Sequence, residues 1–360
     1  MLQNSIIPSR IIALAIVISA GLLYPSCETK PNSAQETPSD SSTVSASNEQ
    51  GNPLRAQASS IFASVSSIHT EQTDDQMVLL GKKLYSDTRL SKNQTISCAS
   101  CHKLNKYGVD NLAFSPGDTK ALGGRNSPSS FYASLHGMQF WDGRAKDVEE
   151  QAGGPILNPV EHNIPAKDFL EKRLSGVEEY KTLFAKAFPG STQPITFDNI
   201  TKAIGAFERQ LHPPSRFDKW LDGDENALTT EEKTGLKTFM EAGCITCHNG
   251  VAIGGNMLQK FGLFGNYWEL TKSKKIDSGR FEVTKNENDK YFFKVPSLRN
   301  IAMTYPYFHD GSVEKLEDAV KIMAKLQNNK DLRDEEISSI VTFLKSLTME
   351  MDEKTTKLLQ

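Results

Sequence analysis

The sequence lacks an excess of positive charge. Lysine and arginine total 41 against 44 aspartate and glutamate residues, the formal net charge is -3, and the basic residues do not form a stripe. Nucleic-acid binding needs such a basic field, so we expect no nucleic-acid partner. Of the 360 residues, 38% are hydrophobic and 24% are charged, a composition typical of a soluble globular protein. This length suits two modest cores better than one large core.

The N-terminus lacks a full membrane span. The apolar run IIALAIVISAGLLYPS is short and follows a single basic residue, Arg10, which predicts a secretory signal peptide over residues 1–27 and export to the periplasm. Ser26 followed by Cys27 resembles the site at which bacterial lipoproteins are cut and lipidated, so we expect a lipid anchor on Cys27 as the only membrane attachment. The alternative is an ordinary signal peptide with an incidental cysteine.

Residues 28–60 contain little that a core would bury. The segment is rich in Ser, Thr, Gln, Asn and Pro, a composition typical of disorder. It predicts a disordered tether, which as a flexible coil would span on the order of 30 Å.

Strand-type alternation is scarce after Asp75, and apolar residues recur at helical spacing instead. Such residues include Ile200, Ile204, Phe207 and Leu211; Tyr180, Leu183 and Phe184; and Ile337, Ile340, Val341 and Leu344. Thr229 and Glu232 predict a capping box that opens a helix ending at Gly243. A helix leads into a cysteine pair here and again before Cys98, which indicates an internal duplication of a small helical unit.

Cysteines are few, and their arrangement is specific. Four of the five lie in the motifs CASCH (Cys98, Cys101, His102) and CITCH (Cys244, Cys247, His248). Two thiols at this spacing add to the two vinyl groups of one haem, and the adjacent histidine reaches the iron. The motifs therefore predict two covalently bound haem c groups, with His102 and His248 as iron ligands.

Three other uses of the cysteine pairs remain alternatives. Zinc sites of the finger or ribbon type have shorter spacing between their pairs and no need of the following histidines. A thioredoxin-like pair belongs in a βαβ context. Disulfides within each pair suit an oxidising compartment but leave both histidines unexplained. Two haems alone do not separate an electron carrier from an enzyme, because that depends on the sixth coordination position of each iron.

Long motifs around the cysteine pairs resemble those of the bacterial dihaem cytochrome c peroxidases. The resemblance extends from about Asp75 to about Leu347. The motifs are LGKKLYSDTRLS before the first pair, GGRNSP at 123–128, FWDGRAKDVEEQAGGPILNPVEH at 140–162, FDNITKAIGAFERQL at 197–211 and VPSLRNIAMTYPYFHDGSVEKLEDAVKIM at 295–323.

The resemblance implies an all-α protein of two cytochrome c-like domains, each with one covalently bound haem c. Residues 61–211 would form the peroxidatic haem domain and residues 212–350 the electron-transfer haem domain, joined near residues 212–226. The implied reaction is reduction of hydrogen peroxide to water by electrons from a small c-type cytochrome or a copper protein of the cupredoxin kind. Members of the family are often homodimers.

The resemblance also assigns site residues. Glu161 is the acid/base carboxylate beside the peroxidatic iron, Gln151 is its neighbour and Trp141 lies between the haems. His162 is interpreted as a polar neighbour only. Met323 is the expected sixth ligand of the second iron, and the other candidates are Met303 and, less favoured because it lies so close to His248, Met257. A calcium ion at the domain interface is expected to bind Asn126 and the backbone carbonyls of Thr304 and Pro306, although the chain has no acidic loop of the EF-hand type.

The chain departs from the family in the loop after the first haem motif. Many members have a histidine there that caps the peroxidatic iron, but the position falls on Asp118, and residues 107–124 contain no histidine. His136 is a candidate substitute. We expect an open or water-bound first iron that reacts with peroxide without prior reduction.

Two rival functions remain. One is a dihaem enzyme that oxidises residues of a partner protein, as the methylamine-utilisation relatives do, although those carry Tyr where this chain has Met323. The other is a pure electron-transfer dihaem cytochrome.

Overall fold

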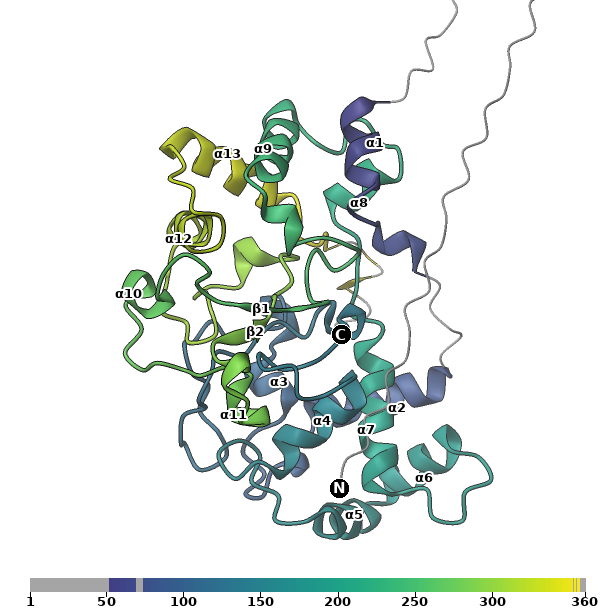
Figure 1. Cartoon of the computed structure of the whole chain (residues 1–360). Coiled ribbons are helices and arrows are strands. Elements are labelled where there is room, and N and C mark those ends of the chain that lie inside the picture. Colours follow the sequence, from purple (N-terminus) through teal and green to yellow (C-terminus); the bar gives the residue numbers. More distant parts are fainter. Residues whose placement is uncertain (1–51, 69–73, 352, 354, 357–360) are drawn as a thin grey trace, which may run out of the picture. The chain divides into compact units, whose positions relative to one another are not determined.

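The computed structural model describes residues 52–68, 74–351, 353, 355 and 356 (Figure 1). The predicted signal peptide, Cys27 and most of the predicted tether lie outside these residues. No helix within the described ranges is long and apolar enough to cross a membrane. The end of the predicted tether is folded, contrary to the prediction: helix α1 (Pro53–Ser59) is capped by the Asn52 side chain, and Ala58 is fully buried.

The described chain is predominantly helical, as expected for an all-α protein. Its α-helices are α1 (Pro53–Ser59), α2 (Asp75–Ser86), α3 (Cys98–Cys101), α4 (Val148–Leu157), α5 (Lys167–Ser175), α6 (Glu178–Ala187), α7 (Phe197–Glu208), α8 (Arg216–Leu221), α9 (Thr230–Glu241), α10 (Tyr267–Thr271), α11 (Phe281–Thr284), α12 (Leu316–Asn328) and α13 (Asp334–Lys345). The short strands β1 (Leu258–Lys260) and β2 (Phe292–Lys294) pair antiparallel, with Leu258 opposite Lys294.

The helices predicted from apolar periodicity are present. Ile200, Ile204 and Phe207 lie on the buried face of α7, and the Ile337 series lies on α13. Thr229 and Glu232 form the predicted capping box of α9. That helix ends at Glu241, and Gly243 follows in the left-handed conformation (φ 88°), which a residue without a Cβ adopts without strain.

Two helix pairs repeat the same packing arrangement. α2 lies against α7, and α9 lies against α13 (Figure 1). At each crossing a glycine faces the backbone of the partner helix: a Cβ on Gly81 would lie 1.8 Å from Ala203 O, and one on Gly235 would lie 2.0 Å from Ser339 O. The repeated glycine crossing agrees with the predicted duplication of a helical unit.

Each helix pair carries its own hydrophobic core. The first core comes almost entirely from residues 65–211, with Met349 added from the C-terminal end. The second comes from residues 217–347, with Ala58 and Phe62 added from the N-terminal end. The two cores are therefore separate along most of the chain, but each takes side chains from the opposite end. The boundary at 211 and 212 stays a prediction.

A fully buried ion pair lies next to the second core. It joins Asp218, on α8, to Arg299, and neither side chain has any exposed surface. The guanidinium donates two hydrogen bonds of 2.8 Å to the carboxylate. Burial raises the pKa of Asp218, but the charge of Arg299 outweighs this effect and the pKa lies below its ordinary value. The segment expected to join the two halves thus contains a buried structural helix.

Adding a methyl group at either glycine crossing should separate the two helices. We expect Gly81→Ala and Gly235→Ala each to lower the free energy of unfolding by at least about 1–3 kcal/mol, because the new Cβ meets a backbone carbonyl that cannot rotate away. Gly124→Ala is the control, since nothing lies within 4 Å of its Cβ position. Denaturant unfolding of the haem-loaded protein measures the effect, and equal stability of all three variants would contradict the packing described.

Candidate haem site

One cavity contains every site residue predicted from the sequence. Its volume is about 640 Å³. The predicted residues that line it are Cys98, Cys101, His102, Asn126, Trp141, Gln151, Glu161, Cys244, Cys247, His248, Thr304, Pro306 and Met323. The fold therefore brings together two cysteine motifs that are far apart in the sequence.

The first motif presents an oriented histidine. Cys98 to Cys101 form the single turn α3, which Ser97 and Ser100 close by a reciprocal capping box. The Nδ1 atom of His102 lies 3.3 Å from Gly108 O, so Nδ1–H donates to the carbonyl and Nε2 keeps the lone pair that binds a metal. Burial lowers the pKa of His102 and keeps its imidazole neutral, as a metal ligand requires.

The second motif has a similar environment. Cys244 begins a 3-10 turn directly after the left-handed Gly243, and burial lowers the pKa of His248 to about 4. All four cysteines in the described residues are free thiols, so no disulfide forms within either pair. Burial raises the pKa of Cys98 above its usual range and that of Cys244 to about 11. Each motif thus supplies two thiols and one neutral imidazole, the set that a c-type haem needs.

Glu161 is positioned by the turn that ends α4. Its backbone N–H donates to Asn158 O at 3.1 Å, and the Asn158 side chain donates to the Glu161 carboxylate at 2.8 Å. Burial raises the pKa of Glu161, while the positive charge of Arg144 and the Asn158 hydrogen bond act in the opposite direction. Gln151, on α4, lines the same cavity. The site therefore holds a carboxyl group whose proton affinity is increased, next to an amide side chain.

His162 also lines the cavity, and its role as a polar neighbour stays a prediction. Its side chain is 5% exposed, and Nδ1 lies 3.0 Å from Leu90 O. This hydrogen bond agrees with the interpretation of His162 as a polar neighbour.

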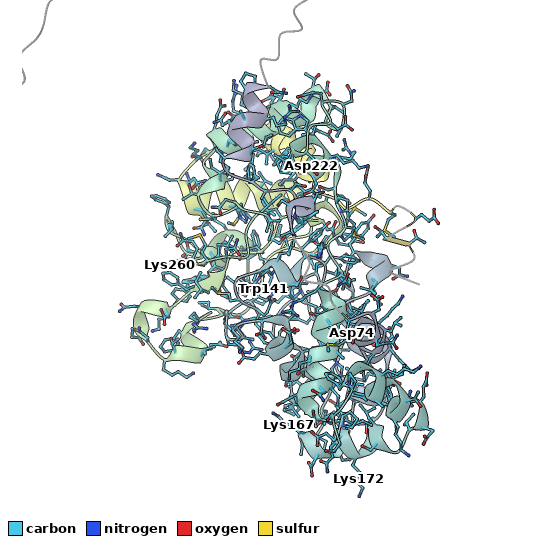
Figure 2. The ribbon with its side chains drawn as sticks, turned by 90° about the vertical axis from the view of Figure 1, so that its right-hand side faces the viewer. Asp74, Trp141, Lys167, Lys172, Asp222 and Lys260 are labelled. Carbon is cyan, nitrogen blue, oxygen red and sulfur yellow. The ribbon has the colours of Figure 1, made fainter. Side chains whose placement is uncertain are left out.

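Trp141 is fixed by its indole N–H. Nε1 donates to Asn126 O at 2.9 Å, and the ring packs edge-on against His309 with centroids 6.3 Å apart. Trp141 and Met323 both pack against the small core of Phe261, Tyr267, Phe293 and Leu326. Figure 2 shows Trp141 between Asp222, at the end of α8, and Asp74, which caps α2.

Among the three candidate methionine ligands, only Met323 lines the cavity. It projects from α12, whereas Met303 is 37% exposed to solvent and the backbone of Met257 pairs with that of Val295. Of the three methionines, Met323 is therefore the one whose location suits a ligand in the cavity.

The residues predicted to bind calcium also line the cavity, without an acidic cluster. The Asn126 Nδ2 donates to Leu112 O at 2.8 Å, which leaves its amide oxygen as the group available to a cation. No group of three or more His, Cys, Asp or Glu side chains in the described ranges is arranged to hold a metal ion. This finding gives no support to the zinc alternative.

Asp118, at the position of the missing loop histidine, does not line the cavity. Its side chain is 4% exposed and accepts hydrogen bonds from Thr95 Oγ1 at 2.7 Å and from Asn93 N at 3.0 Å. Its own N–H donates to Glu161 O at 2.8 Å. Burial raises the pKa of Asp118, but the hydrogen bonds from Thr95 and Asn93 outweigh it, so the pKa lies below its ordinary value. Asp118 is a structural residue that ties its loop to the Glu161 turn.

Lys294, His309 and Glu208 are among the titratable residues of the cavity to which the sequence assigned no role. Lys294 and His309 lie among aromatic residues and are 5% and 2% exposed, and Glu208 is 7% exposed. Burial and the neighbouring Glu149 raise the pKa of Glu208 to about 8. The sequence did contain a signal for Lys294. It stands between the apolar residues Phe293 and Val295, where a charged side chain is costly to bury unless it has a partner. His136, the candidate substitute for the missing loop histidine, also lines the cavity and contacts Lys294.

Comparison with known proteins identifies the family. The model of the di-haem cytochrome c peroxidase family matches residues 75–226. Cytochrome c551 peroxidase of Nitrosomonas europaea is 45% identical, over 86% of this chain and 86% of that protein, and the protein of the same name from Pseudomonas aeruginosa is 44% identical, over 83% and 87%. The chain belongs to the di-haem cytochrome c peroxidase family, which implies two haem c groups.

A solved structure supports the same fold. A MauG-like protein associated with microbial copper homeostasis has a TM-score of 0.68 and 29% identity, over 80% of this chain and 92% of that one.

The buried carboxylate of Asp118 should stabilise the fold without binding haem. Because its folded-state pKa is lowered, this stabilisation is present above the unfolded pKa of about 3.9 and is lost as the pH falls through the lower folded-state value. We expect Asp118→Asn to cost about 1–3 kcal/mol at pH 7, and less at pH values below 4. Denaturant unfolding at both pH values measures this, and the absorption spectrum of the first haem should not change. A changed spectrum would contradict the structural role.

Proposed function

We propose that this protein reduces hydrogen peroxide to water with electrons from a small periplasmic redox protein. The observation that carries the proposal is the position of Glu161, a carboxyl group of raised pKa in the cavity that also holds the CASCH motif. The two cytochrome c551 peroxidases that match most of the chain support it. The overall reaction consumes two electrons and two protons for each peroxide and releases two water molecules.

Glu161 is proposed as the acid/base group. Heterolytic cleavage of peroxide requires a proton to leave one oxygen and reach the departing oxygen, and a single carboxyl group that cycles between two states performs both transfers. A haem held by Cys98, Cys101 and His102 would supply the iron for peroxide reduction. Burial brings the pKa of Glu161 closer to neutral pH, and the Asn158 hydrogen bond holds the carboxylate in one orientation. Gln151 is proposed to position peroxide by hydrogen bonding.

The second half is proposed as the entry for electrons. His248 and Met323 would hold the second haem, whose potential a methionine ligand raises. The location of Met323 on the cavity wall supports this pairing over Met257 and Met303. Trp141, which contacts the same aromatic core as Met323, is proposed as the relay between the two haems. The electron donor is proposed to be a small c-type cytochrome or a cupredoxin.

The resting first iron is proposed to be open or water-bound. Asp118 lies outside the cavity wall, and its carboxylate is fully engaged in hydrogen bonds. His136 lines the cavity, but its Nδ1 accepts from the Lys294 ammonium at 3.3 Å, so its ring proton occupies Nε2 and leaves no lone pair for iron. Neither residue is therefore a suitable substitute for the missing histidine.

The rivals are less well supported. Oxidation of a partner protein is the activity of relatives with Tyr at the position of Met323, and a thioether there favours electron transfer. A pure relay has no use for a carboxyl group of raised pKa in the cavity. The MauG-like structural neighbour keeps the first rival as an outcome to test.

Calcium, location and assembly complete the proposal. A calcium ion is proposed to bind the Asn126 amide oxygen and the carbonyls of Thr304 and Pro306, since oxygen ligands of this type suit calcium and all three residues line the cavity. The protein is proposed to reside in the periplasm, tethered through lipid on Cys27, and to form a homodimer.

Loss of the Glu161 carboxyl group should stop turnover. We expect Glu161→Gln to lower peroxide consumption about 10²–10⁴-fold, because the amide is nearly isosteric but cannot exchange the proton. The measurement is oxidation of a reduced small cytochrome c by peroxide. Glu178→Gln, at an exposed carboxylate outside the cavity, is the matched control. Full activity of Glu161→Gln would disprove the role, and an inactive wild type with both haems present would favour a relay or a protein-modifying enzyme.

An open first iron should make reductive activation unnecessary. We expect fully oxidised enzyme to react with peroxide as fast as enzyme that has first received one electron. Rapid mixing of both preparations with peroxide measures this, and electron paramagnetic resonance reports the coordination of the oxidised first haem. A six-coordinate low-spin signal from that haem, together with reactivity only after reduction, would show that another ligand replaces the missing histidine.

A further inference from the structure

Lys294 is a buried cation without an acidic partner. Its side chain is 5% exposed and lines the cavity, and no Asp or Glu in the described part of the chain forms an ion pair with it. Other cations near the cavity differ: the buried Arg299 is paired with Asp218, and the half-buried Arg125 is paired with Asp142 and Asp277. A buried ammonium without an anion is costly, so the site needs a negative group that the protein does not supply.

The Lys294 ammonium contacts His136, which also lines the cavity. The Nζ atom lies 3.3 Å from His136 Nδ1. A charged ammonium has only donors, so Nδ1 accepts and the imidazole proton lies on Nε2. This Nε2 is itself buried with no hydrogen-bond partner. Lys294 and His136 therefore present donors toward the cavity and no acceptor to match them.

The pair lies beside the second haem motif. Lys294 ends β2, and Pro296 follows two residues further along the chain. A Cβ built on Gly254 would lie 2.4 Å from Pro296 O and 3.2 Å from His248 Nδ1, so these two groups are close neighbours. The His136 ring lies against the adjacent Gly255. On the partner strand, Gln259 Nε2 lies 3.9 Å from Cys247 Sγ. The neighbours of the pair in the chain and in space, Pro296, Gly255 and Gln259, thus lead to the CITCH motif, whose residues line the same cavity.

We infer that Lys294, supported by His136, binds a propionate carboxylate of the haem carried by the CITCH motif and raises the reduction potential of that haem. The inference rests on the two covalent haems of the proposed function but not on peroxide turnover. A haem carries two propionates, and a carboxylate supplies the acceptors that both side chains lack. The cation offsets the negative charge of the propionate, which otherwise stabilises the more positive ferric state.

The titration of Lys294 is consistent with this contact. Burial lowers its pKa to about 8, so the ammonium form predominates at neutral pH but is lost just above it. An adjacent carboxylate opposes this effect and keeps the lysine charged.

Removal of the charge should lower the potential of the second haem. We expect Lys294→Met to shift the ratio of reduced to oxidised second haem at a fixed electrode potential by on the order of tenfold, equivalent to about 59 mV for one electron. Loss of a unit charge about 10 Å from an iron, at an effective dielectric constant of about 20, gives a change of this order. Spectroelectrochemical titration of the full chain with both haems measures each potential without peroxide.

Three further variants test whether the shift comes from the charge of Lys294. Lys294→Arg keeps the charge and should retain the wild-type potential. Lys260→Met, on strand β1 and exposed (Figure 2), is the matched control and should leave both potentials unchanged. If Lys294→Met does not mature with two haems, Lys294→Gln provides the same neutralisation with a polar side chain.

Several results would overturn the inference. If the potential of the second haem is unchanged in Lys294→Met or Lys294→Gln, Lys294 does not bind a propionate of that haem. If only the potential of the first haem shifts, the pair lies at the first haem instead. A wild-type potential that varies with added phosphate or chloride at constant ionic strength would show that an anion from solution occupies the site. If the wild type holds both haems but does not reduce peroxide, while Lys294→Met still lowers the second potential, the proposed function fails and this inference stands.

Discussion

The buried ion pair between Asp218 and Arg299 is the interaction on which the arrangement of the two cores depends. Asp218 also accepts from Val65 N and Ser215, while Arg299 donates to Val251 O and lies over the Tyr132 ring at 5.0 Å. These contacts join segments before and after residue 212. Because both charges are excluded from water, removal of either would leave the other uncompensated, at a cost of about 3–5 kcal/mol. The pair thus connects segments of both halves beside the cavity, which Arg299 itself lines.

Charges within the cavity are distributed unevenly. Glu161 and Glu208, on the side of the CASCH motif, have raised pKa values because burial favours their neutral forms. Lys294 is on the side of the CITCH motif and is cationic. In the proposed function these environments match two tasks: groups that exchange protons accompany the chemistry at the first iron, and a fixed positive charge accompanies acceptance of an electron at the second. In that proposal, proton transfer and electron entry take place on different sides of one cavity.

The predictable parts of the structure are those that local physics determines. Helical periodicity identified α7, α9 and α13, and the CxxCH spacing identified both motifs, because each signal lies within a few residues of sequence. Met323 needed the family resemblance, since a methionine at helical spacing is ordinarily a core residue. The contact between His136 and Lys294 joins residues 158 positions apart and has no local signal. Helix α1 was missed because its composition is polar, while its order comes from the Asn52 cap and the burial of Ala58 and Phe62 in a distant core.

The exchange of chain ends between the cores has a consequence for how the molecule can be divided. Ala58 and Phe62 precede the first core in sequence but are buried in the second, and Met349 follows the second core but is buried in the first. A cut between the two haem motifs would therefore leave each fragment without side chains that its own core requires. The two halves are therefore not independent modules, because each relies on side chains from the far end of the chain to complete its core.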